Sequence, residues 1–248
     1  RAASSHTGAI ASSDAAVEAL FRKAGIVRCH SREELTTAGC IFSIVAHPQP
    51  LPKGGESVLP ANNATLPSGG AGGGCIITHA GGPGVMLTDA LSKGGLKVPK
   101  LEGTATEELK SQLFAGSSVS NPIDILATGN AEQLGIAIDY CDKRFPEIDA
   151  IFVIFGTPGL VQVYNVYDVL HQKILECSKP IFPILPSVHT AGPEVAEFLK
   201  KGHVNFSDEV TLASMLPRVI GTPPPAAPEV ELFGVDVPRI RNIIRNIK

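Results

Sequence analysis

The clearest pattern in the chain is an alternation of short apolar runs with amphipathic segments, which starts at Cys75. Apolar runs at 75–78, 150–155 and 180–185 are typical of parallel strands that are buried on both faces. Two shorter strands are predicted at 96–101 and 204–206. The segments between these runs have apolar stripes at helical spacing, which predict helices at 85–93, from 104 to about 114, from 130 onward, at about 160–177, at 194–201 and from 207 to about 220.

Strands that alternate with helices form βαβ units, in which right-handed crossovers connect the strands of a parallel sheet. We therefore predict an α/β fold, with a flavodoxin-like three-layer domain over residues 74–222. A tight turn is expected at 81–84, between the first strand and its helix, and an irregular loop at 121–124.

The first 47 residues predict a smaller helix–strand–helix unit. N-cap candidates at 12–14 precede an apolar helical stripe, and Gly25 is expected to end this helix. A short strand is predicted at 26–29. The capping box Ser31-Arg32-Glu33-Glu34 then opens a second helix that runs to about Cys40. A single strand cannot form a sheet, so residues 1–47 are expected to be the C-terminal part of a partial α/β domain.

Two segments rich in proline or glycine divide the chain. Residues 48–73 predict a linker, with four prolines between Pro48 and Pro60 and a glycine-rich stretch near its end. Prolines at 223–228 predict a second linker, which leads to a helix at 237–248 with isoleucines at helical spacing. The sequence has no start methionine and this last helix has no cap, so we expect an excised piece of a longer protein.

Composition and charge exclude several classes of protein. With 44% hydrophobic and 18% charged residues in 248, the chain is not intrinsically disordered. It has no secretory signal and no run as long as a membrane span, and its net charge of −3 argues against bulk affinity for nucleic acid or an anionic membrane. The five cysteines are widely spaced without a C-x-x-C pair, which predicts reduced thiols in a cytoplasmic protein. No metal ligands are assigned.

His6 is the first candidate for chemistry. It lies in Ser5-His6-Thr7-Gly8-Ala9, where small neighbours leave the imidazole accessible just before a helix. A neutral imidazole is a good nucleophile toward phosphorus and a good leaving group afterwards. From these residues alone, an ordinary exposed loop histidine is the stronger interpretation.

The second candidate is Thr78-His79-Ala80-Gly81-Gly82-Pro83-Gly84-Val85, at the predicted carboxyl end of a parallel strand. Gly81, Gly82 and Gly84 would let the backbone approach an anion, which the helix N-terminus attracts. A tight turn without a ligand has equal weight, and His79 is expected to be a strand-end residue rather than a ligand. Asp124 in Asn121-Pro122-Ile123-Asp124 either bonds turn amides, the favoured interpretation, or points toward the anion.

Four motifs together resemble the NDP-forming acyl-CoA synthetases, typified by ADP-forming acetate–CoA ligase and related to succinyl-CoA synthetase. In chain order they are S-H-T-G-A-I-A at 5–11, Q-P-L-P-K-G at 49–54, T-H-A-G-G-P-G-V at 78–85 and S-N-P-I-D at 120–124. The resemblance covers nearly the whole chain. Its specificity rests on the first and third motifs occurring together.

This resemblance implies that acyl-CoA, ADP and phosphate are converted to a carboxylic acid, CoA and ATP through an acyl phosphate and a phosphohistidine. By motif position His6 matches the phosphorylated histidine, and Gly81, Gly82 and Gly84 match a turn at a helix that points its dipole at the phosphoryl group. Thr7, Gly8 and Asp124 are supporting candidates.

The family also implies partners: a CoA-binding domain upstream, an ATP-grasp domain or subunit downstream, a small acyl substrate, ADP or ATP with Mg, and an oligomer. Residues 56–73 look like an insertion. The isolated chain is expected to be inactive, because it holds neither substrate-binding domain. The alternative is a non-catalytic anion- or nucleotide-binding regulatory module, for example part of a protein acyltransferase.

Overall fold

The computed structural model describes residues 13–46, 72–157, 163–222, 239 and 242. The chain divides into two compact units, one of Arg1–Ile26 with Pro223–Lys248 and the other of Val27–Thr222. Residues 48–71 of the first predicted linker and all of the second lie outside the described residues, whereas Gly73 forms a bridge with Lys97. Of the helix predicted at 237–248, only Arg239 and Asn242 are described, and both are helical. The domain boundaries at 47, 73 and 222 stay predictions.

In the first unit, helix α1 (Asp14–Lys23) confirms the first predicted helix. It begins after Ser13 and ends at Ala24, and Gly25 adopts the left-handed conformation with φ 67°. The Gly25 amide donates to the carbonyl of Arg22 and the Ile26 amide to that of Phe21, which is the Schellman pattern for a helix end. The strand predicted at 26–29 is wrong, because these residues do not pair with a strand.

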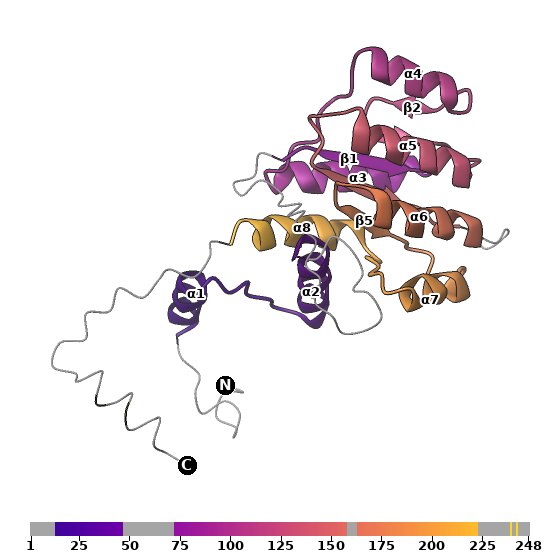
Figure 1. Cartoon of the computed structure of the whole chain (residues 1–248). Coiled ribbons are helices and arrows are strands. Elements are labelled where there is room, and N and C mark those ends of the chain that lie inside the picture. Colours follow the sequence, from indigo (N-terminus) through magenta and orange to yellow (C-terminus); the bar gives the residue numbers. More distant parts are fainter. Residues whose placement is uncertain (1–12, 47–71, 158–162, 223–238, 240–241, 243–248) are drawn as a thin grey trace. The chain divides into compact units, whose positions relative to one another are not determined.

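The second unit is built on a five-stranded sheet in the order β2-β3-β1-β4-β5 (Figure 1). Strands β1 (Gly74–Thr78), β3 (Ile123–Asp124), β4 (Ala150–Ile154) and β5 (Ile181–Ile184) are parallel, and only β2 (Ser118–Val119) is antiparallel to its neighbour β3. All five residues of β1 and of β4 are buried. The flavodoxin-like α/β prediction is therefore confirmed.

Helices cover both faces of this sheet (Figure 1). On one face, Cys75 and Ile77 of β1 join the core formed with α4 (Thr104–Gln112), α5 (Ala131–Lys143), α6 (Tyr164–Glu176) and α7 (Gly192–Lys200). On the other, Ile76 joins the core formed with α2 (Arg32–Ala46), α3 (Gly81–Lys93) and α8 (Glu209–Ile220). None of these described helices combines the length and the apolar composition that a membrane crossing requires.

Helix α2 shows where local and tertiary signals act together. Its predicted start is confirmed, because the Glu34 amide donates to Ser31 Oγ at 3.0 Å and the Glu34 carboxylate accepts the His30 amide at 2.8 Å. The hydrogen bond from the His30 amide lowers the pKa of Glu34. Burial opposes this shift, and Arg218 adds to it. The helix continues to Ala46 rather than ending near Cys40, because Ile41 and its neighbours pack against α8. Arg218 fixes the contact by bonding Glu34 at 3.2 Å and the Arg28 carbonyl.

Two of the predicted strands shrink to single bridges. Residues 96–101 contribute only the bridge of Lys97 to Gly73, and residues 204–206 only that of Phe206 to Ile184. Helix α4 begins after Gly103, which has φ 92°, and no side chain caps it. In contrast, the Asn130 and Asp208 side chains accept the amides of Gln133 and Thr211 and cap α5 and α8.

The side chain of Asn121 completes the hydrogen bonding of the central strand. Its Oδ1 accepts the Ile76 amide at 2.9 Å, and its Nδ2 donates to the carbonyls of Gly74 and Pro99, both at 2.9 Å. On this edge β3 pairs with β1 only at Ile77 and Thr78, and the Gly74 amide donates to the Lys97 carbonyl at 2.8 Å. Without Asn121, the Gly74 carbonyl and the Ile76 amide would lose the partners that this side chain gives them. Asn121 has φ 71°, a left-handed conformation that asparagine tolerates better than most residues.

Asn121→Ala should therefore destabilise the chain by about 2–4 kcal/mol. The substitution leaves buried backbone groups of β1 without hydrogen-bond partners, and it places alanine in a left-handed conformation that alanine adopts only with strain. Urea unfolding of the full chain measures this loss. Asn165→Ala is the matched control, since within the described part of the chain the Asn165 side chain accepts just the neighbouring Val166 amide. Equal stability of the Asn121 and Asn165 variants would contradict this role.

Candidate functional site

The first turn of α3 lies at the switch point of the sheet. Strand β3 pairs with one edge of β1 and β4 with the other, so the chain leaves β1 toward one side and later returns on the opposite side. In open parallel sheets the crevice outside the carboxyl ends of such strands is the usual place for a ligand. Thr78, Asp124 and Ile154 end the three strands that form this crevice.

Thr78 shapes the connection from β1 to α3. Its buried side-chain oxygen donates to the Ala80 carbonyl at 2.8 Å and accepts the Ala80 amide at 3.0 Å. Helix α3 starts directly afterwards at Gly81, without a side-chain cap on Ala80. The separate tight turn predicted at 81–84 is thus wrong in detail: these residues are the first turn of the helix, where amides lack intrahelical partners.

The three glycines of this turn have different surroundings. A Cβ atom on Gly84 would lie 3.0 Å from Cγ2 of Thr78 and 3.6 Å from Cβ of Pro122, so this position packs tightly against the ends of β1 and β3. A Cβ atom on Gly82 would meet nothing within 4 Å, so its exposed backbone is open to approach from outside. Gly84 thus serves packing, and Gly82 leaves room.

Asp124 fixes a turn and lies beside the start of α3. Its Oδ1 accepts the amide of Leu126 at 2.8 Å, which fixes the turn after β3. Its Oδ2 lies 3.7 Å from the position that a Cβ atom on Gly81 would occupy, so the carboxylate also lies beside the start of α3. A negative charge at a helix N-terminus interacts favourably with the helix dipole.

His79 occupies the crevice between β1 and β4. Its ring stacks on Phe155 with centroids 4.5 Å apart, and its Nδ1 lies 3.4 Å from the Ile154 carbonyl oxygen. Burial lowers the pKa of His79, although the Ile154 carbonyl and the charge of Asp124 oppose this shift. The neutral ring is favoured at neutral pH. Sequence reasoning placed His79 at a strand end but not against Phe155, since that contact joins residues of different strands.

The remaining candidates, His6, Thr7 and Gly8, lie outside the described residues. Gly81, Gly82, Gly84 and Asp124 are brought together, whereas the distance from His6 to them is not defined.

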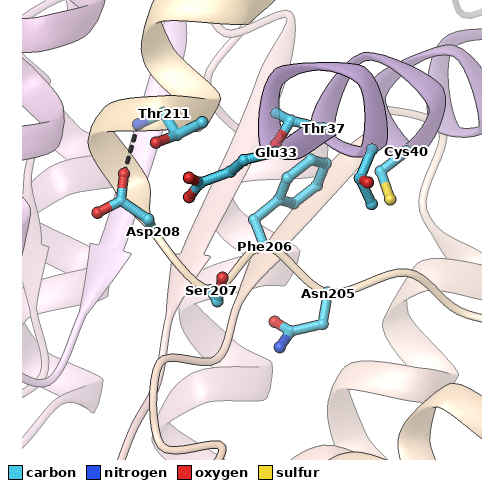
Figure 2. Close-up of a pocket in the computed structure, with 9 residues that line it drawn as sticks. Glu33, Thr37, Cys40, Asn205, Phe206, Ser207, Asp208 and Thr211 are labelled. Atoms are coloured by element: carbon cyan, nitrogen blue, oxygen red, sulfur yellow. Dashed lines mark hydrogen bonds between the residues drawn. The ribbon is translucent and has the colours of Figure 1, made fainter. Parts of the chain in front are cut away.

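A separate pocket of about 350 Å³ opens between α2, the residues after the Phe206 bridge and the start of α8 (Figure 2). Its carboxylates belong to Glu33, in the first turn of α2, and Asp208, which accepts the Thr211 amide at 2.5 Å. Both acids therefore lie at helix N-termini, where they stabilise the helices themselves. Of the described candidates, Gly81, Gly82, Gly84 and Asp124 do not line this pocket. Across the described ranges no three histidines, cysteines or acids converge as a metal site.

Comparisons with known proteins agree on one family. The family model described as "Succinyl-CoA ligase like flavodoxin domain" matches residues 1–42. The alpha subunit of ADP-forming acetate–CoA ligase II from Pyrococcus furiosus is 36% identical over 132 residues, which are 53% of this chain and 24% of that subunit. The ADP-forming 4-hydroxybutyrate–CoA ligase from Nitrosopumilus maritimus is 28% identical over 72% of this chain and 22% of that ligase.

The solved structures show the same fold. A dinucleotide-forming acetyl-coenzyme A synthetase 1 from Ca. Korarchaeum cryptofilum, in complex with phosphate and ADP, matches with a TM-score of 0.68 at 23% identity. The match covers 90% of this chain and 44% of that one. The chain thus spans less than half of this structure and at most 24% of the two curated relatives.

The contrast between Gly82 and Gly84 gives a matched pair of substitutions. Gly84→Val should destabilise the chain by about 1–3 kcal/mol, because the new side chain must displace Thr78 and Pro122. Gly82→Val should change stability by no more than about 0.5 kcal/mol, because its side chain enters open space. Thermal or urea unfolding of both variants checks this difference. The packing assignment is contradicted if Gly84→Val is no less stable than Gly82→Val.

Proposed function

We propose that the chain is part of an NDP-forming acyl-CoA synthetase and that it carries the phosphoryl-relay part of that enzyme. The whole reaction would convert acyl-CoA, ADP and phosphate to a carboxylic acid, CoA and ATP. Phosphate attacks the thioester carbonyl and CoA leaves as the thiol. The imidazole of His6 then takes the phosphoryl group and the carboxylate leaves. Finally, the terminal phosphate oxygen of ADP attacks the phosphohistidine, which releases the imidazole.

The first turn of α3 carries this proposal. Amides at a helix N-terminus and the positive end of the helix dipole bind phosphoryl oxygens without a charged side chain. Gly82 offers its backbone without obstruction, and the turn lies at the switch point of a parallel sheet. In the proposed relay, Gly81, Gly82 and Gly84 receive the phosphoryl group that His6 carries, while Thr7 and Gly8 keep the surroundings of the imidazole small.

The other parts of the enzyme are proposed from the family. A CoA-binding domain upstream and an ATP-grasp domain or subunit downstream would supply CoA and ADP or ATP. Mg²⁺ would be bound with the nucleotide there. Cytoplasmic localisation and an oligomeric assembly belong to the same proposal, as does the assignment of residues 1–47 to a His6-bearing domain and 74–222 to the flavodoxin-like domain.

Asp124→Asn tests the proposed phosphate site at the first turn of α3, with inorganic phosphate as the ligand. Asparagine can still accept the Leu126 amide, but it removes a negative charge beside Gly81. The variant should bind phosphate roughly two- to fivefold more tightly, the effect of one charge at a helix end. Chemical shifts of the Gly81 and Gly82 amides during a phosphate titration measure the affinity. Asp89→Asn, on the exposed side of α3, controls for net charge. If Asp124→Asn and Asp89→Asn bind phosphate with equal affinity, the anion does not bind at the first turn of α3.

The histidine is tested in the protein that contains this chain. Incubation with Mg·ATP labelled at its γ-phosphate should place one acid-labile, base-stable phosphate on His6. His6→Ala should lose the label and the synthetase activity, whereas His30→Ala, which changes an exposed histidine, should retain both. If the wild-type protein is not labelled, the proposed phosphoryl relay through His6 is wrong. If phosphate still bound at Gly82 in that case, the regulatory-module alternative would be favoured.

A further inference from the structure

Two histidines outside the candidate site are in direct contact. His171 is in the middle of α6, and His203 follows the end of α7. Nδ1 of His171 lies 2.5 Å from Nε2 of His203, and the two rings meet edge to face. The other side of the His203 ring stacks on Phe198, with centroids 4.6 Å apart, and only 9% of His203 is exposed.

This geometry requires that the two rings share one proton. A nitrogen–nitrogen contact of this length forms only if one ring donates and the other accepts. A zinc ion with ordinary Zn–N distances would need a ligand angle of only about 75° to fit between the nitrogens, far below the tetrahedral value. A second proton at this contact binds the accepting nitrogen, so that both facing nitrogens become donors and the ring that gains the proton becomes positively charged. The contact then becomes repulsive.

The surrounding charges do not relieve this repulsion. Lys201, whose charge acts on His203, forms ion pairs with Asp168 of α6 and with Glu197 of α7, so both carboxylates are engaged by the lysine. Burial, the proximity of His171 and the charge of Lys201 together lower the pKa of His203 to about 4. The fold thus stabilises the neutral form of His203.

The pair ties α6 to the edge of the sheet. Two residues after His203, the Asn205 side chain accepts the Leu185 amide at 2.8 Å and donates to the Leu185 carbonyl at 3.1 Å. The Phe206 amide then donates to the Pro183 carbonyl at 3.0 Å, and Phe206 lines the pocket at the start of α8. His203 is thus the anchor of a short segment that has only one bridge to β5.

We propose that the His171–His203 pair is an acid-sensitive clamp, whose second protonation releases residues 203–206 from β5 before the rest of the domain unfolds. An unfolded histidine titrates near 6.5, so protection by the clamp is complete above that pH and is lost as the pH falls toward 4. For these two values the opening equilibrium should increase roughly 20- to 30-fold between pH 7 and pH 5.

Hydrogen exchange of single amides in the full chain tests this clamp, after correction for the intrinsic exchange rate. The Phe206 amide should lose protection by that factor between pH 7 and pH 5, whereas the Phe152 amide in β4 should not. The variant His171→Gln/His203→Gln should remove most of the pH dependence, and His189→Gln, which changes an exposed histidine, should leave it unchanged. Constant protection of Phe206, or an equal loss at Phe152, would overturn the proposal.

A measurement on the unmodified protein covers the case in which the double variant does not fold. ¹⁵N shifts of the histidine rings should show one protonated nitrogen shared by His171 and His203 at pH 7, and a second proton arriving only well below pH 6.5. If both rings titrate independently near 6.5, the clamp does not exist.

Discussion

Every residue of strand β1 is buried, so the backbone amides and carbonyls along both of its edges must find hydrogen-bond partners within the protein. The rest of the unit depends on these hydrogen bonds. Strand β4 covers one edge over its full length, from Gly74 to Thr78. On the other edge β3 reaches only the last two residues, and the side chain of Asn121 supplies the partners for Gly74 and Ile76. A single side chain therefore completes the ladder at the same strand from which α3 leaves toward the candidate site.

Much of the fold could be predicted because its signals are local. The apolar runs that became β1, β4 and β5 and the caps at Ser31 and Asn130 depend on neighbouring residues alone. Edge segments such as 96–101 could not be predicted, because ladder length is decided by the partner strand. The end of α2 was placed too early for a related reason, since its last turns are stabilised by packing on α8, which is about 170 residues away in sequence.

In the candidate site, too, local features could be predicted from the sequence and contacts between strands could not. That a glycine-rich connection joins a strand end to a helix could be read from the order of residue types, and so could the family motifs, but not that Gly81–Gly84 are already the first turn of that helix. The difference between Gly82 and Gly84, the position of Asp124 beside Gly81 and the stacking of His79 on Phe155 depend on β3 and β4 reaching the same edge as β1. No spacing within one motif contains that information. The comparisons support the family, while the relation of His6 to this edge stays a prediction.

The carboxylate of Asp124 at the mouth of α3 has a consequence for the lifetime of any bound anion. A binding site made of amides and a helix dipole attracts an incoming phosphoryl group. A fixed negative charge beside such a site lowers its affinity for the anion and shortens the time for which the anion stays bound. Tight retention would serve storage of a ligand. A group that must arrive from one molecule and depart to another is better served by a site from which it dissociates quickly, and in the proposed relay the carboxylate next to Gly81 would set that balance.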